Sequence, residues 1–410
     1  MDYETLRVTE VKEIKNFKLE KDDLSLLRGP SSDVEWESTI DIKLSQDKKK
    51  YLLIYEPYKV WSPDGVPDNK QIYFAVMDSD AKLLYDKTES YPLTFASVSL
   101  KDFCLTSNNK ILSLFTLADK PFFRAYRSNY STYVRSIDIK NGKANDIKFD
   151  KELGYVRACK FLPDSTDMSK IEIIGTYSDQ WQMEEITGGF HLSYSPVDEK
   201  AKTVAKQALP SSIDLKSIYE QYYSEKNHED RPLYSRLNPI YAGWRENKSI
   251  DLVIECQSPY FGKLRLAETG TAVIRYTSCI NLNFSNAVMR ATVVPKNQVN
   301  LNMGGENMIG AFAVPYKDKL LLFYNDLVSN ITNKGKVEEL TTRSDNYGIA
   351  VAEIDAGGNS TTRILTSDFT KKEFAEIIHA KVINKTTILL RVAEHVSRYK
   401  KFRISAIYLK

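Results

Sequence analysis

The sequence has little of several features that mark large protein classes. It contains no apolar run approaching the ~20 residues that a membrane-spanning helix needs. Lys and Arg number 57 against 54 Asp and Glu, so the formal charge is only +3, and no basic block typical of nucleic-acid binding interrupts the mixed charges. Gly and Pro number 17 and 14, which excludes collagen-like and low-complexity chains. These absences leave a folded globular chain, with no nucleic-acid partner and no membrane-spanning segment predicted.

Residues that commonly hold metals or form disulfides are also scarce. The four cysteines are Cys104, Cys159, Cys256 and Cys279; no two are spaced as C-x-x-C, and each lies in an apolar, strand-like stretch. We therefore expect small buried core residues rather than disulfide partners. The four histidines are scattered, and the sequence contains no H-E-x-x-H, P-loop, G-x-S-x-G or G-x-G-x-x-G motif. No metal and no cofactor are predicted.

Aromatic residues and short β-type runs are abundant instead. Tyr and Phe number 25 and 17, and polar turns separate strand-like segments along almost the whole chain. Six runs are the most apolar, and their starts are 60 to 80 residues apart: YLLIYE from Tyr51, ILSLFT from Ile111, IEIIGTY from Ile171, DLVIEC from Asp251, LLLFYN from Leu320 and TILLRVA from Thr387. This spacing indicates a sixfold repeat, with units longer than the about 40 to 50 residues of familiar propeller blades.

Each apolar run occupies the same place in its repeat. A strand and a short turn precede it, a longer loop and a third strand follow, and most repeats continue into a fourth strand. Four antiparallel strands repeated six times indicate an all-β fold, a six-bladed β-propeller, in preference to two separate β-sandwiches. Because the last repeat has only three strands, we expect a strand at Leu6–Leu19 to close the ring and remove two exposed sheet edges.

The repeats predict a single domain over residues 1–410, without a linker. Its blades are predicted at about residues 36–91, 96–150, 153–209, 237–296, 306–367 and 374–410. One short helical insert is predicted at about 212–225, where Leu215, Ile218, Tyr219 and Tyr222 follow a helical period. In the fourth blade, Asn281–Ala287 is predicted to be a longer connection between the last two strands.

The loops on the two faces of the predicted propeller differ. Turns after the first and third strands of most blades are short and polar, whereas loops after the second strands and between blades are long and aromatic. Binding residues concentrate in loops held on a rigid scaffold, and aromatic and Arg side chains dominate interface energetics. We therefore predict a binding face made by ten loop residues: Trp61, Phe122, Phe123, Arg124, Tyr126, Arg127, Trp181, Tyr260, Phe261 and Tyr399. The alternative is that these loops fold over one another and bury their own rings.

A carboxylate stands near the end of nearly every second strand, at Glu56, Asp119, Asp179, Glu255, Asp326 and Glu394. Asp179 and Asp326 follow similar segments, Tyr-Ser-Asp and Tyr-Asn-Asp, and are the best candidates for glycosidase chemistry or Ca²⁺ binding. Asp also ends strands by capping the turn that follows, and this structural role is the favoured interpretation.

Several segments carry a resemblance to other proteins: Ile173–Tyr194 with its G-x-Y-S-D, Glu306–Asp326 with its Y-N-D, Ile349–Leu365 with its E-I-D-x-x-G turn, and the C-terminal FRISAIYL. Together they resemble an uncharacterised group of bacterial propeller-like proteins that are usually exported. The resemblance implies a location in the cell envelope, in the periplasm or at the cell surface, and brings no activity. Since the N-terminus has no apolar signal segment, the chain is expected to be either cytoplasmic or a mature segment whose export signal was removed.

These observations favour a non-catalytic recognition or assembly module that presents the aromatic face to a protein or glycan partner. The alternative is a carbohydrate-active hydrolase or lyase that uses Asp179 and Asp326 near the channel. An enzyme of that kind should bring two or three carboxylates within about 5 to 10 Å of one another. A structural lipoprotein component of an envelope complex is a third interpretation, which differs from the first only in its partner.

Overall fold

The computed structural model describes most of the chain with gaps. The described residues are 39–56, 69–92, 99–118, 130–149, 153–164, 166–179, 186–211, 213, 236–260, 273–300, 310–332, 340, 346–366, 373–396 and 399–409. The predicted closing strand at Leu6–Leu19 lies outside these residues, and so does the predicted helical insert at about 212–225, apart from Ile213.

The described chain is almost entirely β-structure, in six antiparallel sheets that follow one another along the sequence. The first three sheets contain β1 (Thr39–Leu44), β2 (Lys50–Glu56), β3 (Asn69–Asp78) and β4 (Leu83–Pro92); β5 (Ser99–Leu105), β6 (Lys110–Ala118), β7 (Tyr130–Asp138) and β8 (Ala144–Lys148); and β9 (Tyr155–Pro163), β10 (Ile171–Ser178), β11 (Gly188–Ser195) and β12 (Lys200–Ala208).

The last three sheets repeat this order, and the sixth has three strands among the described residues. They contain β13 (Arg236–Trp244), β14 (Ile250–Tyr260), β15 (Val273–Ser285) and β16 (Val288–Asn300); β17 (Ala311–Tyr316), β18 (Lys319–Leu327), β19 (Tyr347–Ile354) and β20 (Ser360–Thr366); and β21 (Glu373–Asn384), β22 (Thr387–Val396) and β23 (Tyr399–Tyr408). The one described helix is the short α3 (Val328–Thr332). The prediction of an all-β, propeller-like chain of antiparallel sheets is confirmed.

Tight turns join the first two strands of the sheets. Lys48, Asn109, Lys248 and Lys317 adopt positive φ angles between 55° and 67° in four of these turns. Such left-handed positions let the chain reverse within a few residues. The polar turn sequences therefore fix the register of the first hairpin in each of these sheets.

The predicted long connection at Asn281–Ala287 is wrong. Strand β15 continues to Ser285, and Ser285 pairs directly with Val288 across a turn in which Asn286 has a φ of 55°. The sequence suggested a loop because three asparagines fall close together. Two of them are buried within the strand instead, where the side-chain amides of Asn281 and Asn283 donate to the Asp251 carboxylate at 3.1 and 2.8 Å.

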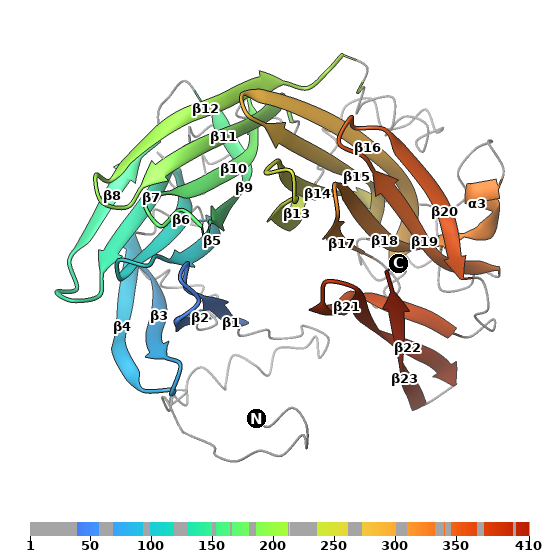
Figure 1. The fold of residues 1–410 in the computed structure, drawn as a ribbon, viewed down its shortest axis with the longest axis horizontal. Helices are drawn as coiled ribbons and strands as arrows, with labels where there is room; N and C mark the ends of the chain where they lie inside the picture. Colours follow the sequence, from blue (N-terminus) through green and yellow to red (C-terminus); the bar gives the residue numbers. More distant parts are fainter. Residues whose placement is uncertain are drawn as a thin grey trace, which may run out of the picture.

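The six sheets lie side by side around a central opening (Figure 1). Each successive pair of sheets encloses its own cluster of buried apolar side chains, from β1–β4 against β5–β8 to β17–β20 against β21–β23. Burying a large apolar side chain stabilises a fold by about 1.5 to 3 kcal/mol, so these five clusters supply the main cohesion between sheets. Within the described ranges, no apolar cluster of this kind joins the last sheet to the first.

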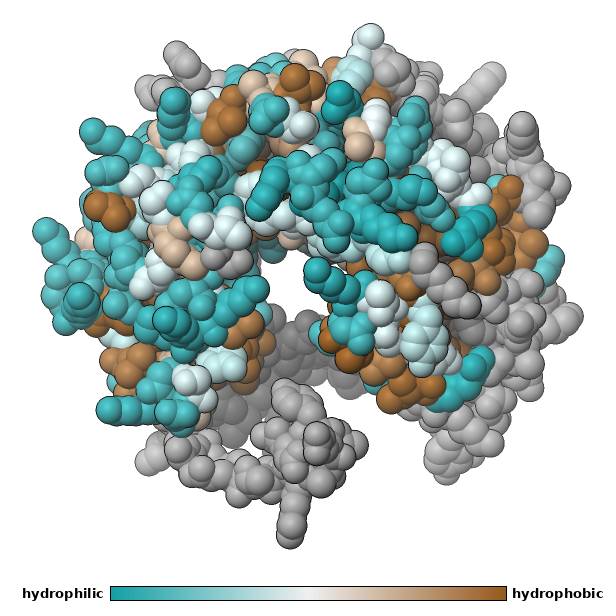
Figure 2. Space-filling model, in the orientation of Figure 1, coloured by the Kyte–Doolittle hydropathy of each residue, from teal (hydrophilic) through white to brown (hydrophobic). Residues whose placement is uncertain are grey.

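The two end sheets expose apolar side chains where an inner sheet would bury them. Ile40 and Ile42 of β1 are 63% and 60% exposed, and Ile404 and Tyr408 of β23 are 75% and 68% exposed. Among the residues that the structure describes, most of the exposed large apolar side chains belong to these two sheets. The face seen in Figure 2 is otherwise largely hydrophilic around the central opening.

All four cysteines are buried and free, as the sequence predicts. Burial raises the pKa of the Cys104 thiol to about 12, so this thiol is unreactive at neutral pH. Within the part of the chain that the structure describes, no helix is long and apolar enough to cross a membrane.

Candidate functional site

Most of the predicted binding face lies outside the described residues. This applies to eight of its ten members: Trp61, Phe122, Phe123, Arg124, Tyr126, Arg127, Trp181 and Phe261. The backbone is described at the other two, Tyr260 at the end of β14 and Tyr399 at the start of β23. Both positions lie at the connection between the second and the third strand of a sheet. The long loops emerge from this end of the sheets. The binding face therefore remains a prediction.

The two candidate carboxylates are not paired with each other. Asp179 follows β10 of the third sheet and is exposed, and its backbone N–H donates to the Thr187 hydroxyl at 3.1 Å. Asp326 is buried in β18 of the fifth sheet. Its Oδ1 accepts hydrogen bonds from the Leu327 N–H at 2.8 Å and from the Asn330 amide at 2.7 Å. Asp326 thus holds the start of α3.

Asp326 also borders a buried polar group that we call the Lys296 cluster, formed by Glu255, Lys296, Gln298, Asn325 and Asp326. The Lys296 ammonium is completely buried, forms an ion pair with the Glu255 carboxylate and donates to Gln298 Oε1 at 3.0 Å. Gln298 donates to the Asn325 carbonyl at 2.8 Å, and the Asn325 amide donates to the Ala375 carbonyl at 2.6 Å. The cluster therefore connects the fourth, fifth and sixth sheets.

The chemistry available to the Lys296 cluster is proton binding near neutral pH. Burial raises the pKa of Asp326 to about 6, although the hydrogen bonds from Asn330 and Leu327 and the charge of Lys296 oppose the shift. A carboxyl group with such a pKa has the property that general acids need. However, Glu255 and Asp326 are 3% and 2% exposed, so a substrate has no direct access to them in this structure. The geometry supports a structural role between sheets.

Neither Lys296 nor Gln298 is among the residues predicted from sequence. The usable signal was their spacing, because two polar residues that are two positions apart in a β-run point to the same side of the sheet. The lysine at the end of VMRATVVPK gave no clear signal of burial, since lysines usually extend into solvent.

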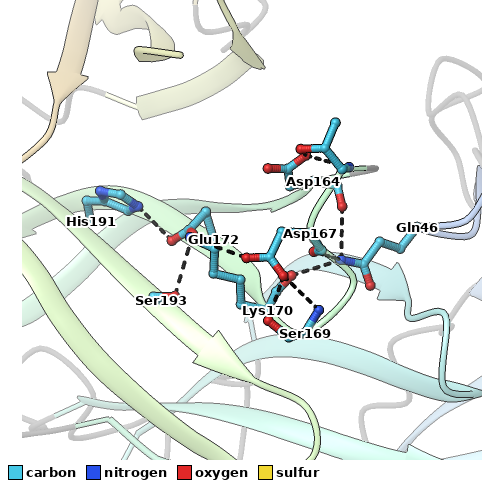
Figure 3. A network of polar contacts seen from close by, with 9 residues as sticks. Gln46, Asp164, Asp167, Ser169, Lys170, Glu172, His191 and Ser193 are labelled. Atoms are coloured by element: carbon cyan, nitrogen blue, oxygen red, sulfur yellow. Dashed lines mark hydrogen bonds and ion pairs between the residues drawn. The ribbon is translucent and has the colours of Figure 1, made fainter.

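A second buried polar group lies within the third sheet (Figure 3). The Glu172 carboxylate of β10 lies 2.8 Å from Nε2 of His191 in β11 and 2.9 Å from the Lys170 ammonium. Burial alone would raise the pKa of Glu172, but its hydrogen bonds to His191 and Lys170 outweigh burial and hold that pKa below its usual range. Nδ1 of His191 is buried without a hydrogen-bond partner. In the sequence, His191 is only one of four scattered histidines and belongs to no motif.

The Gln46 side chain fixes the neighbouring β9–β10 turn (Figure 3). Its Nε2 donates to the backbone carbonyls of Asp164 at 3.1 Å, Asp167 at 2.9 Å and Lys170 at 2.8 Å. The backbone N–H of Gln46 donates to the Leu105 carbonyl at 2.9 Å. One buried residue in the β1–β2 turn therefore ties the first three sheets together at their turn end.

Beside Gln46 lies a cavity of about 460 Å³, which we call the turn pocket. Its walls come from the β1–β2, β9–β10 and β13–β14 turns, and they include Lys48, Asp164, Trp244 and Lys248. This volume is within the range of about 300 to 1,000 Å³ typical of small-molecule sites. Burial would raise the pKa of Asp164, but hydrogen bonds from Thr166 and the charge of Lys248 hold it below its usual range. The pocket lies at the end of the sheets opposite the predicted binding face.

Metal binding has no support in the described ranges, which contain no group of three His, Cys, Asp or Glu side chains placed to hold an ion. No sequence motif or described residue indicates a cofactor site.

Comparisons with known proteins give similarity of shape only. No family model matches the chain, and no curated protein matches it. A protein of unknown function from Dyadobacter fermentans is 10% identical over 91% of this chain and 94% of its own, with a TM-score of 0.37. An α-L-arabinofuranosidase from Fusarium graminearum is 9% identical over 92% and 95%, with a TM-score of 0.38. An acylaminoacyl peptidase from Pyrococcus horikoshii is 9% identical over 92% of this chain but 47% of its own, with a TM-score of 0.39. No function is inferred from these similarities.

Proposed function

We propose that this protein is a non-catalytic recognition or assembly module, built as a closed six-bladed propeller. Six consecutive sheets with a core cluster between each successive pair support this architecture. The segment Leu6–Leu19 would add a fourth strand beside β23 and close the ring between the end sheets. The apolar residues exposed on β1 and β23 support closure, because ring formation would bury them.

The observation that carries the recognition proposal is the asymmetry of the loops. Connections between first and second strands are as short as the turn from Tyr316 of β17 to Lys319 of β18. Connections between second and third strands span residues 57–68, 119–129 and 261–272, and residues 328–346 including α3. A rigid scaffold that carries long loops at one end favours binding through that end. The partner would be a protein or a glycan, and the proposed location is the bacterial cell envelope.

A hydrolase or lyase is the alternative, and the described carboxylates give it little support. Glu255 forms an ion pair with a buried lysine, and the Asp326 carboxylate accepts hydrogen bonds from its own turn. Asp179 follows a strand of the third sheet, whereas Glu255 and Asp326 lie in strands of the fourth and fifth sheets.

The test is binding to a glycan array and to envelope extracts, with cross-linking and identification of captured proteins. A variant carrying Phe122→Ala, Phe123→Ala and Tyr126→Ala should bind the identified partner at least tenfold more weakly, since aromatic hot spots contribute about 2 kcal/mol or more each. Val197→Ala, which changes an apolar residue 71% exposed in the β11–β12 turn, is the matched control. Unchanged binding of the triple variant would refute the binding face. Glycan cleavage that Asp326→Asn abolishes would support the enzyme instead.

A further inference from the structure

We propose that the turn pocket is a second binding site, and that it takes a neutral oligosaccharide. This site is independent of the proposed binding face, because it is formed by turns at the opposite end of the sheets. Its walls come from three different sheets, so only the assembled fold creates it.

The first argument is the rigidity of the pocket. Gln46 is 2% exposed and holds the β9–β10 turn through three carbonyl oxygens. On the other wall, Arg245 is fixed by the Asp251 carboxylate, with Nε to Oδ2 at 2.5 Å and Nη2 to Oδ1 at 2.9 Å. A preformed site avoids the entropic cost of ordering loops when a ligand binds.

The second argument is the balance of charge in the lining. Lys48 and Lys248 supply two ammonium groups, Asp164 and Glu246 supply two carboxylates, and Asp251 neutralises Arg245. An ionic ligand would need a surplus of one sign, which this lining lacks. A polyol uses donors and acceptors together, and the pocket offers both.

The third argument is Trp244, which is half-buried in the pocket wall and packs partly against the core between the third and fourth sheets. Its ring provides an apolar surface next to the charged groups, and a sugar ring has an apolar face bordered by hydroxyls. The indole nitrogen of Trp244 is buried without a hydrogen-bond partner. Buried polar atoms are normally satisfied, so this nitrogen is a donor for which the described residues supply no acceptor.

The experiment is isothermal titration calorimetry of the full chain with cellotriose, maltotriose and galactotriose as neutral probes, and with trigalacturonic acid as a charged comparison. At least one neutral probe should bind, and Trp244→Ala should weaken its binding at least tenfold. Lys248→Asn should weaken binding severalfold; asparagine suits this position because Lys248 has a φ of 67°. Trp244→Phe, which keeps an aromatic ring, should retain part of the affinity and guards against misfolding of the alanine variant.

Two control variants separate this site from the predicted binding face. Val197→Ala and the triple variant Phe122→Ala, Phe123→Ala and Tyr126→Ala should bind the neutral probe as the unmodified protein does. The proposal is overturned if no neutral probe binds with a Kd of about 1 mM or tighter. It is also overturned if only trigalacturonic acid binds, or if Trp244→Ala and Lys248→Asn bind normally. Loss of binding in the triple variant alone would move the glycan site to the other end of the sheets.

Discussion

The ion pair between Arg245 and Asp251 gives the sharpest prediction about stability. Both side chains are completely buried, and the Asp251 carboxylate also accepts from Asn281 and Asn283. The replacement Asp251→Ala leaves the guanidinium buried without its counter-charge and removes an acceptor from the Asn281 and Asn283 amides, of which Asn283 keeps the Ser249 hydroxyl at 3.1 Å. Removing one partner of a buried ion pair costs about 3 to 5 kcal/mol. Since proteins are stable by about 5 to 15 kcal/mol, we expect a large fraction of the unfolding free energy to be lost.

The assay is urea denaturation at pH 7, followed by circular dichroism. Glu353→Ala is the control, because Glu353 forms exposed ion pairs with Lys319 and Arg363 and its loss should cost less than about 1 kcal/mol. The double replacement Arg245→Met with Asp251→Leu removes both charges, so it should be more stable than Asp251→Ala alone. A loss below about 1 kcal/mol in Asp251→Ala would refute the reasoning, as would a double variant less stable than the single one.

Three further predictions concern other parts of the fold. Because the folded pKa of Asp326 is about 6 and its usual value is 3.8, the folded state binds this proton more tightly, and the unfolding free energy should fall by roughly 2 kcal/mol as pH rises from 4 to 7. Denaturation of Asp326→Asn across this range should lack that fall, and parallel pH profiles for the two proteins would contradict it. In a closed ring, Ile404→Asp should destabilise by about 2 kcal/mol or more, whereas Val197→Asp should cost less than about 0.5 kcal/mol; equal effects in thermal melts would contradict closure. A methyl group on Gly175 would overlap the Ala158 carbonyl oxygen and the Phe190 ring, so Gly175→Ala should lower the melting temperature by several degrees, and an unchanged melting temperature would contradict this close packing.

Much of the fold was predictable because β-structure has a short sequence period. The apolar runs beginning at Tyr51, Ile111 and Leu320 form the second strands of their sheets, and the polar turns before them fall where the chain reverses. The error at Asn281–Ala287 shows the limit of this logic. Asparagine is common in turns. Only the buried Asp251 carboxylate on the neighbouring strand explains why Asn281 and Asn283 lie inside a strand instead.

The candidate sites were less predictable because their residues come together only in three dimensions. The turn pocket joins Gln46, Asp164 and Trp244 from three sheets, and none of these residues belongs to a sequence motif. Glu255 and Asp326 were noted only as strand-end carboxylates, and nothing in the sequence indicated that Lys296 lies buried beside Glu255. Long-range contacts of this kind leave no local period to detect.

The buried polar contacts share one property that bears on how six similar sheets adopt a single arrangement. Arg245 of the fourth sheet donates to the Asp318 and Ile354 carbonyls of the fifth, and Asp102 of the second sheet accepts from Lys43 of the first and the Phe161 N–H of the third. The apolar clusters between sheets are chemically alike, so they discriminate weakly among alternative pairings of sheets. A buried charge without its partner is costly, so each of these contacts penalises any arrangement that separates it. We therefore expect the polar groups inside this fold to act by making incorrect pairings of sheets unfavourable.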